Sequence, residues 1–569
     1  MAPRHRPMAS PAPGHPQTRW CGRGRGGGRG RGGGGARGGA LRRAVLVVAL
    51  VAVLVVVGLM FAFGRGAMAR PTIAHDYGRQ IQERALARQE AVFGPGLNQW
   101  DQFRASLGTV RGAVEWLEQY NKDLPVDPDD TWRHVTPDLI YIEPDGGTPE
   151  QFERARGRAL EVLARWEAMG VFEAARAIAG LERVARSYDD RPLFDQWMSE
   201  GGTARGLARA LAARARLAAR AGDDAARLEA VAHTLALGRV VGGSGLLIDH
   251  LVGTAIMALA RNELLHGLLL HPVEDDAWLR TADELLRLEL EGRASTMADA
   301  LGAERLFIAD AVQRAYTDDG AGGGRLLPFA YARLIGYDEF DSFSPLTPLG
   351  MNRLSNIHGD LFLGRKALDR WLDELLRLSL DALEATGPAI IGADRRVAEH
   401  MASADWRNPI GRDLLSSIHV LLTDRLMRIE AAGSRVVLAI ERYRLANGGR
   451  PPATLDVLGP LLPDGLRADP VTGQPWDYEP TALTLDEQGR PLLEGATAWP
   501  YTLRSRPWPE APSLRSGSPS RLATGVLITV PIQGPKYDAP LDDWDSWDGH
   551  DAGEEAEDGT AAESAHGPG

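Results

Sequence analysis

Apolar residues run without interruption from Ala44 to Phe63, and this stretch of twenty residues contains no charged or polar side chain. At a rise of 1.5 Å per residue, an α-helix of this length is about 30 Å long, which matches the hydrocarbon thickness of a bilayer. Backbone groups in lipid need internal hydrogen-bond partners, so the stretch is expected to be helical. The pattern predicts a single transmembrane helix at 44–63.

The flanks of this stretch indicate its orientation. Ten arginines and no acidic residue precede it, and the positive-inside rule then places residues 1–43 in the cytoplasm. The body is therefore expected on the periplasmic or extracytoplasmic side of the cytoplasmic membrane. A cleaved signal peptide is the alternative, because Ala67-Met68-Ala69 fits a cleavage site. Signal peptides usually have shorter apolar runs, of about 7–15 residues, so a retained anchor is favoured.

Beyond the anchor, hydrophobic positions recur mostly at helical spacing. In 204–240, apolar residues such as Leu207, Leu211 and Leu235 lie on either side of a turn at Ala221-Gly222-Asp223, which predicts a helical hairpin. Its small-residue packing resembles a tetratricopeptide-type helix pair, but no 34-residue period recurs, so a solenoid-like body is expected. Further helices are predicted at 77–92, 246–270, 274–294, 297–316, 365–386 and 411–447.

The segment 246–270 is apolar enough to suggest a second transmembrane helix. Four polar residues interrupt it: Asp249, His250, Arg261 and Glu263. Charged side chains are costly in the bilayer, so the pattern favours a buried helix of the body.

The chain changes character after Gly448, where prolines and glycines separate short β-prone runs. Strands are predicted at 476–478, 482–485, 501–503 and 525–532, with an earlier one at 139–142. The fold class is therefore mainly α with a small α+β module at the C-terminal end. Six segments are expected: a disordered Arg/Gly-rich tail at 1–43, the transmembrane helix at 44–63, a helix-plus-loop segment at 71–148, a helical, solenoid-like domain at 149–410, a long helix with a small β module at 411–535, and a disordered acidic tail at 536–569.

Charge and cysteine content limit the function of the body. The whole chain carries −12 and its first 43 residues carry +10, so the remainder carries −22. This argues against nucleic-acid binding by the body, because phosphate neutralisation needs an excess of lysine and arginine, and it favours a basic partner. The only cysteine, Cys21, lies in the predicted cytoplasmic tail. The body therefore has no disulfide and no cysteine nucleophile.

Candidate catalytic residues are few. Glu263 and His266 form an ExxH pair on one helix face, but a ferritin-like site needs a second such pair and two further carboxylates. A core or surface histidine is the favoured interpretation. No HExxH, GxSxG, Walker A or strand-linked GxGxxG motif occurs, so no catalytic, cofactor-binding or metal-binding residue is predicted. An enzyme would instead need several of six side chains in one cleft: Glu263, His266, His358, Glu399, His400 and His419.

The loop 319–330 is similar to an EF-hand calcium loop. With Asp319 at position 1, Gly324 falls at the glycine of position 6 and Leu326 at the apolar position 8. Three ligand positions carry non-ligating residues: Ala321, Gly323 and Ala330. The loop is interpreted as a degenerate calcium loop or a glycine-rich turn.

The stretch Arg435–Tyr478 carries a family likeness. A helix is followed by Asn447-Gly448-Gly449, which tolerates left-handed backbone geometry, and Pro451-Pro452 prevents the helix from resuming. Thr454 is expected to cap the next helix, and Asp469, Pro470 and Gly473 are expected to form a turn. These residues resemble the globular part of type II secretion major pseudopilins, a resemblance that covers about residues 424–505. The matching positions are Tyr443, Asn447, Gly448, Pro452, Thr454, Leu458, Asp469, Pro470, Gly473, Pro475 and Tyr478.

The resemblance implies a fold rather than filament assembly, because the apolar segment lies far upstream and the prepilin-peptidase signature is absent. Some pseudopilins bind Ca²⁺ in the strand loop; here Asp469 and Asp477 are the matching acids, and a turn role is expected for them. The overall layout is similar to that of uncharacterised membrane-anchored proteins of planctomycete-type bacteria.

These observations predict a membrane-anchored, exported interaction or scaffold protein. Its partners would be the membrane, through 44–63, and a protein or peptide bound by the helical surface. Two alternatives stay open: an exported hydrolase-type enzyme with a helical active site, and a component associated with a secretion system.

Overall fold

The computed structural model describes residues 71, 73–124, 149–196, 200–291, 296–318, 323–327, 363–404, 407–408, 417–480, 500–506, 526 and 528. The predicted transmembrane helix at 44–63 and the two terminal tails lie outside these residues, as do the predicted strands at 139–142 and 482–485. No helix in the part described is both long and apolar enough for a membrane span.

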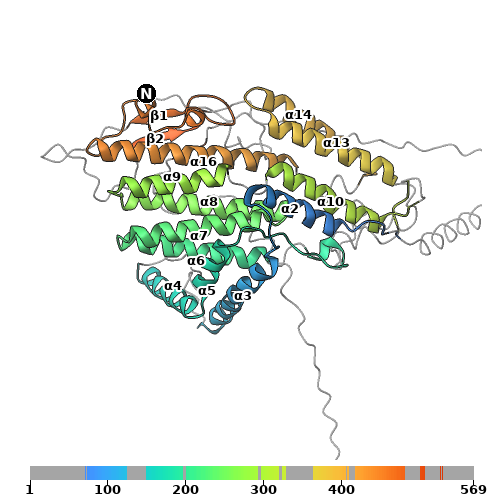
Figure 1. The fold of residues 1–569 in the computed structure, drawn as a ribbon, viewed down its shortest axis with the longest axis horizontal. Helices are drawn as coiled ribbons and strands as arrows, with labels where there is room; N and C mark the ends of the chain where they lie inside the picture. Colours follow the sequence, from blue (N-terminus) through green and yellow to red (C-terminus); the bar gives the residue numbers. More distant parts are fainter. Residues whose placement is uncertain are drawn as a thin grey trace, which may run out of the picture. The chain divides into compact units, whose positions relative to one another are not determined.

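The described chain is mainly helical, which confirms the predicted class (Figure 1). The elements are α2 Tyr77–Phe93, α3 Trp100–Asp123, α4 Pro149–Ala168, α5 Val171–Ala179, η2 Leu193–Gln196, α6 Gly201–Arg220, α7 Asp224–Gly242, α8 Leu247–Leu270, α9 Asp276–Glu291, α10 Met297–Ala315, α13 Arg365–Glu384, α14 Ala389–Ala402, α16 Ser417–Ala446, η4 Leu455–Leu458, η5 Asp464–Leu466, β1 Asp477–Pro480 and β2 Tyr501–Arg504.

The predicted hairpin in 204–240 is confirmed as α6 and α7, and its turn follows the expected chemistry. Gly222 adopts a φ of +69°, and the Asp223 side chain caps α7 by accepting a hydrogen bond of 3.0 Å from the Ala226 amide. The other predicted helices are also present. Thr296 and Asp299 form a reciprocal capping box at the start of α10, which explains why this helix begins where it does.

Helices α7 and α8 pack backbone against backbone. A Cβ atom on Gly253 would lie 2.3 Å from the Gly238 carbonyl oxygen and 2.4 Å from the Gly242 nitrogen. Only glycine permits this approach, and it brings the buried faces of the two helices together over most of their length. The segment 247–270 is thus a core helix of the body, in agreement with the sequence prediction.

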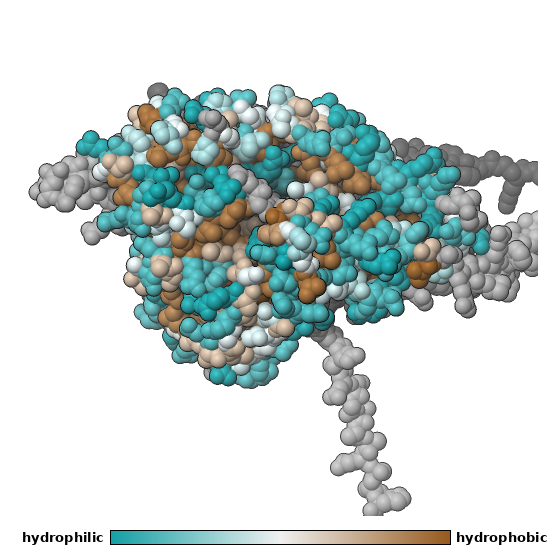
Figure 2. Space-filling model, in the orientation of Figure 1, coloured by the Kyte–Doolittle hydropathy of each residue, from teal (hydrophilic) through white to brown (hydrophobic). Residues whose placement is uncertain are grey.

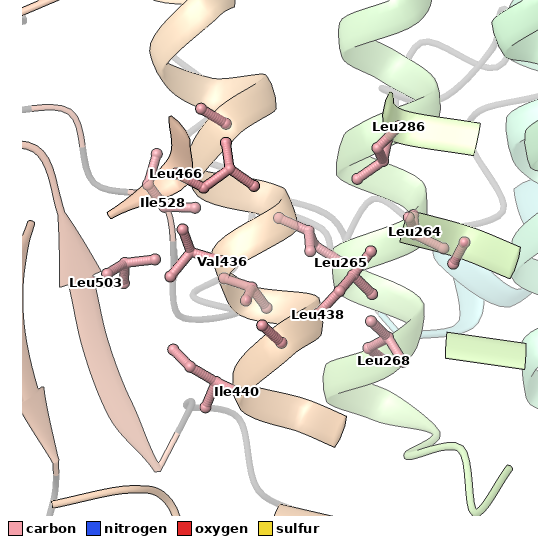
Figure 3. Close-up of a cluster of buried hydrophobic side chains, with 14 of the residues drawn as sticks. Leu264, Leu265, Leu268, Leu286, Val436, Leu438, Ile440, Leu466, Leu503 and Ile528 are labelled. Carbon is pink, nitrogen blue, oxygen red and sulfur yellow. The ribbon is translucent and has the colours of Figure 1, made fainter. Parts of the chain in front are cut away.

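Helix α16 separates two apolar layers that belong to one continuous core (Figure 3). On one side, Val436 and Ile440 lie beneath Leu503 of β2 and Ile528. On the other, Leu438 faces α8. Strands β1 and β2 pair antiparallel, with Tyr478 opposite Leu503.

The end of α16 follows the predicted stop signal. Gly448 and Gly449 have φ values of +64° and +81°, which terminate the helix in the left-handed region. The predicted turn is also present, since the Asp469 carboxylate accepts hydrogen bonds from the backbone amides of Val471 and Thr472 at 2.8 and 3.1 Å.

One local prediction in this module was wrong. Thr454 occupies the N-cap position of η4, but its side chain makes no capping hydrogen bond. Its backbone takes the extended geometry that precedes the short 3₁₀ turn.

Candidate functional site

The ExxH pair is used for helix packing. The Arg216 guanidinium of α6 donates two hydrogen bonds to the Glu263 carboxylate of α8, so the charge of Glu263 is compensated. Burial and, to a smaller extent, the positive charge of Arg216 together lower the pKa of His266 to about 4. A histidine with this pKa is neutral at physiological pH. This environment is consistent with the favoured interpretation of a core or surface histidine.

Glu399 and His400 lie on α14 in a different setting. The His400 ring stacks on Trp371 of α13 with centroids 4.8 Å apart, and its Nε2 lies 2.9 Å from the Trp371 carbonyl oxygen. Glu399 is exposed to solvent. His400 therefore joins α14 to α13, while Glu399 lies on the solvent side of α14.

The structure does not bring the six candidate side chains into one described cluster. Glu263 pairs with Arg216 of α6, and the charge of the same arginine acts on His266, whereas His400 contacts Trp371 of α13. His358 and the His419 side chain lie outside the described residues. Within the part of the chain that is described, no group of three or more histidine, cysteine, aspartate or glutamate side chains has a metal-binding arrangement.

The predicted EF-hand-like loop is described only at its ends. Tyr316 and Leu326 form an antiparallel bridge, and the Thr317 amide donates to the Arg325 carbonyl at 3.0 Å. A Cβ atom at Gly324 would lie 1.8 Å from the Thr317 carbonyl oxygen. This close approach explains why a glycine is required at position 324. Residues 319–322 and 328–330 lie outside the described part.

A buried polar network around Arg186 is the richest constellation in the body. The Arg186 guanidinium donates to Asp249 of α8 at 2.9 Å and lies 3.2 Å from the Glu200 carboxylate. Ser244 donates to the other Asp249 oxygen at 2.8 Å. The same guanidinium lies over the Trp100 ring, 5.3 Å from its centroid. Four separate segments are thus joined by one cation.

Two further titratable groups, Tyr188 and Glu304, lie near this network. The Tyr188 hydroxyl is buried and makes no hydrogen bond within the described structure, and burial raises its pKa. Glu304 of α10 lies close enough to Asp249 for the two charges to interact, and its pKa rises to about 7, chiefly through burial. A carboxyl with this pKa titrates under physiological conditions.

A hollow of about 320 Å³ lies at the start of α6, next to this network. Its charged lining is mixed in sign, and Glu200 joins it to Arg186. The lining residues are Asp101, Arg104, Ala105, Leu107, Arg111 and Glu200. A second cavity, of about 10 Å³ beside Gly243 and Gly245, has room for about one water molecule.

Sequence reasoning singled out Asp249 but missed its partners. Arg186 directly follows the apolar residues Val184 and Ala185, and a charge in such surroundings signals a buried ion pair. The partner, 63 residues away, has no local signature. Glu304 carries no motif at all.

No protein-family model, curated protein or solved structure matches the chain. The function is therefore inferred from the residues and their contacts.

Proposed function

We propose that the chain is a membrane-anchored scaffold whose helical body lies outside the cytoplasm and binds a protein or peptide. The observation that carries this proposal is that the charged side chains buried in the body join helix to helix. Three ion pairs do so: Arg216–Glu263 between α6 and α8, Arg261–Glu430 between α8 and α16, and Arg425–Asp394 between α16 and α14. Such pairs fix the relative positions of helices and thus give a defined surface.

The arrangement of the helices supports a solenoid-like interpretation. Helices α6, α7 and α8 pack on one another in succession, and α9 and α16 continue the series (Figure 1). Stacked helices of this kind offer long exposed faces for binding. The face in Figure 2 is predominantly hydrophilic, with hydrophobic residues in separate patches, as expected for a surface in contact with water.

The hollow beside Glu200 is the proposed contact for the partner. Arg104 and Arg111 lie there with Asp101 and Glu200, so the hollow is lined by both signs of charge. Complementary charges of this kind favour specific orientation of a partner. The overall negative charge of the body favours a partner that is basic in total.

The anchor is proposed from the apolar run 44–63 and its arginine-only flank. Protease added to intact spheroplasts should digest the chain beyond residue 70 and spare the N-terminal tail. Protection of the body would overturn the topology. A soluble product that begins at Arg70 would show signal cleavage instead.

The binding surface is tested by a photo-crosslinking residue placed at Arg104, beside the hollow, in the membrane-bound full chain. A matched variant carries it at Arg280, an exposed arginine of α9. We expect a discrete covalent adduct from position 104 only. Equal adducts from both positions, or none from position 104, would contradict the proposed surface.

A secretion-associated role is a second candidate, favoured by one specific observation. Helix α16 ends at a glycine pair and is covered by an antiparallel hairpin, an arrangement that agrees with the likeness to pseudopilins in 435–478. Co-purification with the secretion machinery, lost when 435–505 is replaced by a flexible linker, would support this role.

A further inference from the structure

Helix α16 is followed directly by the single Asn-Gly pair of the chain, Asn447-Gly448. Both residues are exposed to solvent. Gly448 takes a φ of +64°, and the Gly449 amide donates to the Arg444 carbonyl oxygen at 2.8 Å. The pair thus lies in the closing turn of the helix, where the regular hydrogen bonding of α16 ends.

The backbone nitrogen of Gly448 is accessible in this turn. Its amide donates no hydrogen bond within the described structure, whereas the amides of Asn447 and Gly449 both donate to the Arg444 carbonyl oxygen, at 3.0 and 2.8 Å. Apart from its chain neighbours, nothing described lies within 4 Å of the position that a Cβ atom on Gly448 would take. The nitrogen is therefore open to solvent bases and to a neighbouring electrophile.

The Asn447 side chain provides that electrophile, its carboxamide carbon. The Nδ2 atom donates to the Tyr443 carbonyl oxygen at 2.7 Å, in an exposed contact. Helix ends open at little cost in free energy, so fraying of the last turn releases the carboxamide. The Cγ atom of Asn447 then reaches the Gly448 nitrogen, because the two are close along the chain and close a five-membered ring.

We propose that Asn447 undergoes spontaneous deamidation in the folded chain, and that the product loosens the end of α16. Solvent hydroxide removes the Gly448 amide proton, and the nitrogen attacks the Asn447 Cγ atom. The Cγ–Nδ2 bond breaks, and Nδ2 leaves as ammonia with a proton taken from water. Water then opens the cyclic imide at either carbonyl carbon, which gives aspartate or isoaspartate. Nothing is oxidised or reduced.

The product weakens the closing turn in two ways. A carboxylate has no proton to donate, so the Tyr443 carbonyl oxygen loses the hydrogen bond that Nδ2 gave it. The carboxylate also places a negative charge beside the last carbonyl groups of α16, where the helix dipole favours a positive charge. Isoaspartate in addition lengthens the backbone of the turn by one methylene group.

This turn is connected to the hairpin through Arg444. The guanidinium donates to the Gly449 carbonyl oxygen at 3.0 Å and to the Glu441 carboxylate at 2.7 Å, and Glu441 accepts a hydrogen bond from Tyr501 of β2 at 2.7 Å. When the turn opens, Arg444 loses its contact with Gly449, and its hold on Glu441 weakens. This effect does not depend on the proposed binding function.

Incubation of the purified full-length chain under native conditions at pH 6 and pH 9 tests the reaction, with peptide mapping by mass spectrometry at intervals. We expect the peptide that contains Asn447 to convert to its aspartyl and isoaspartyl forms, faster at pH 9 because hydroxide starts the reaction. Asn98 is the internal control. Both ends of its carboxamide are bonded to the Ala185 backbone, at 2.9 and 3.1 Å, and the residue after it is not glycine, so it should stay unmodified.

Two variants separate the effect of the product from that of the substitution. Asn447→Asp carries the charge of the aspartyl product, and we expect its amides in 444–449 and in β2 to lose hydrogen-exchange protection. Asn447→Gln keeps a carboxamide that donates hydrogen bonds but does not close the five-membered ring. It should keep the protection of the wild type and should not lose ammonia.

Each contrary result overturns the proposal. Conversion of Asn447 only in urea, and not in the folded chain, would show that the folded turn protects this residue. Equal conversion of Asn98 and Asn447 would show that the turn does not select the site. Wild-type protection in Asn447→Asp would show that the product does not loosen the end of α16.

Discussion

The Tyr501 hydroxyl of β2 donates a hydrogen bond of 2.7 Å to the Glu441 carboxylate of α16. Arg444 binds the same carboxylate at 2.7 Å and donates to the Gly449 carbonyl oxygen at 3.0 Å. One buried acid therefore connects the hairpin, the long helix and the turn that ends it. The position of the hairpin depends on a polar contact as well as on the apolar core.

Tyr501→Phe removes this hydrogen bond and leaves the rest of the ring in place. Since hydrogen bonds to charged groups are stronger than average, we expect a loss of about 2 kcal/mol in the free energy of unfolding. Urea unfolding of the purified chain measures it. Tyr188→Phe is the matched control, because its buried hydroxyl has no hydrogen-bond partner in the described structure and its removal should cost nothing.

Gly253→Ala tests the backbone contact between α7 and α8. The added methyl group would overlap the Gly238 carbonyl oxygen, at 2.3 Å, and a backbone atom cannot move aside as a flexible side chain can. We expect the free energy of unfolding to fall by about 3 kcal/mol or more. Thermal unfolding of Gly253→Ala, beside that of the control variant Gly112→Ala, measures this loss.

Gly112→Ala is the control for this substitution. Nothing lies within 4 Å of the Cβ position at Gly112 of α3, so alanine there should stabilise the helix by about 0.5–1 kcal/mol. Equal effects at the two glycines would mean that α7 and α8 do not pack as closely as described.

Asp394→Asn tests the buried ion pair that ties α14 to α16. Arg425 donates to both oxygens of Asp394, at 2.5 and 2.8 Å, and is 2% exposed. The neutral asparagine side chain leaves the Arg425 guanidinium buried without a counter-charge. We therefore expect the free energy of unfolding to fall by about 3–5 kcal/mol. Asp381→Asn breaks an exposed pair with Arg377 and should leave the unfolding curve unchanged. A similar shift of the unfolding curve in Asp394→Asn and Asp381→Asn would contradict the buried position of the Arg425–Asp394 pair.

The sequence predicted the helices well because their signals are local. The hairpin of α6 and α7 was recognisable from apolar residues at helical spacing and from Gly222 and Asp223 between them. The stop of α16 followed from Gly448 and the prolines after it. In each case the residues that determine the structure lie within a few positions of one another.

The polar network was not predictable in the same way. Arg186 and Asp249 are 63 residues apart, and Arg425 and Asp394 are 31 apart. Which arginine meets which acid depends on how the helices pack, and packing is set by shape complementarity over the whole core. The four polar residues of α8 indicated correctly that it is not a simple lipid-facing helix, but they did not identify their partners.

The last prediction concerns Ile440, which is fully buried between β2 and the body (Figure 3). Ile440→Asp removes an apolar side chain from the core and buries a carboxylate without a partner, so we expect a loss of more than about 4 kcal/mol. Ile440→Val should cost only about 1 kcal/mol. Leu445→Asp, at a 36% exposed position near the end of the same helix, should be tolerated.

The structure also indicates where the Ile440→Asp defect spreads. Because the core is continuous across α16 and includes Leu264 and Leu265 of α8, we expect α8 and α9 to lose hydrogen-exchange protection together with the hairpin. Limited proteolysis locates the first cuts. Cleavage confined to 435–505, with α8 and α9 still protected, would show that the module unfolds independently of the body.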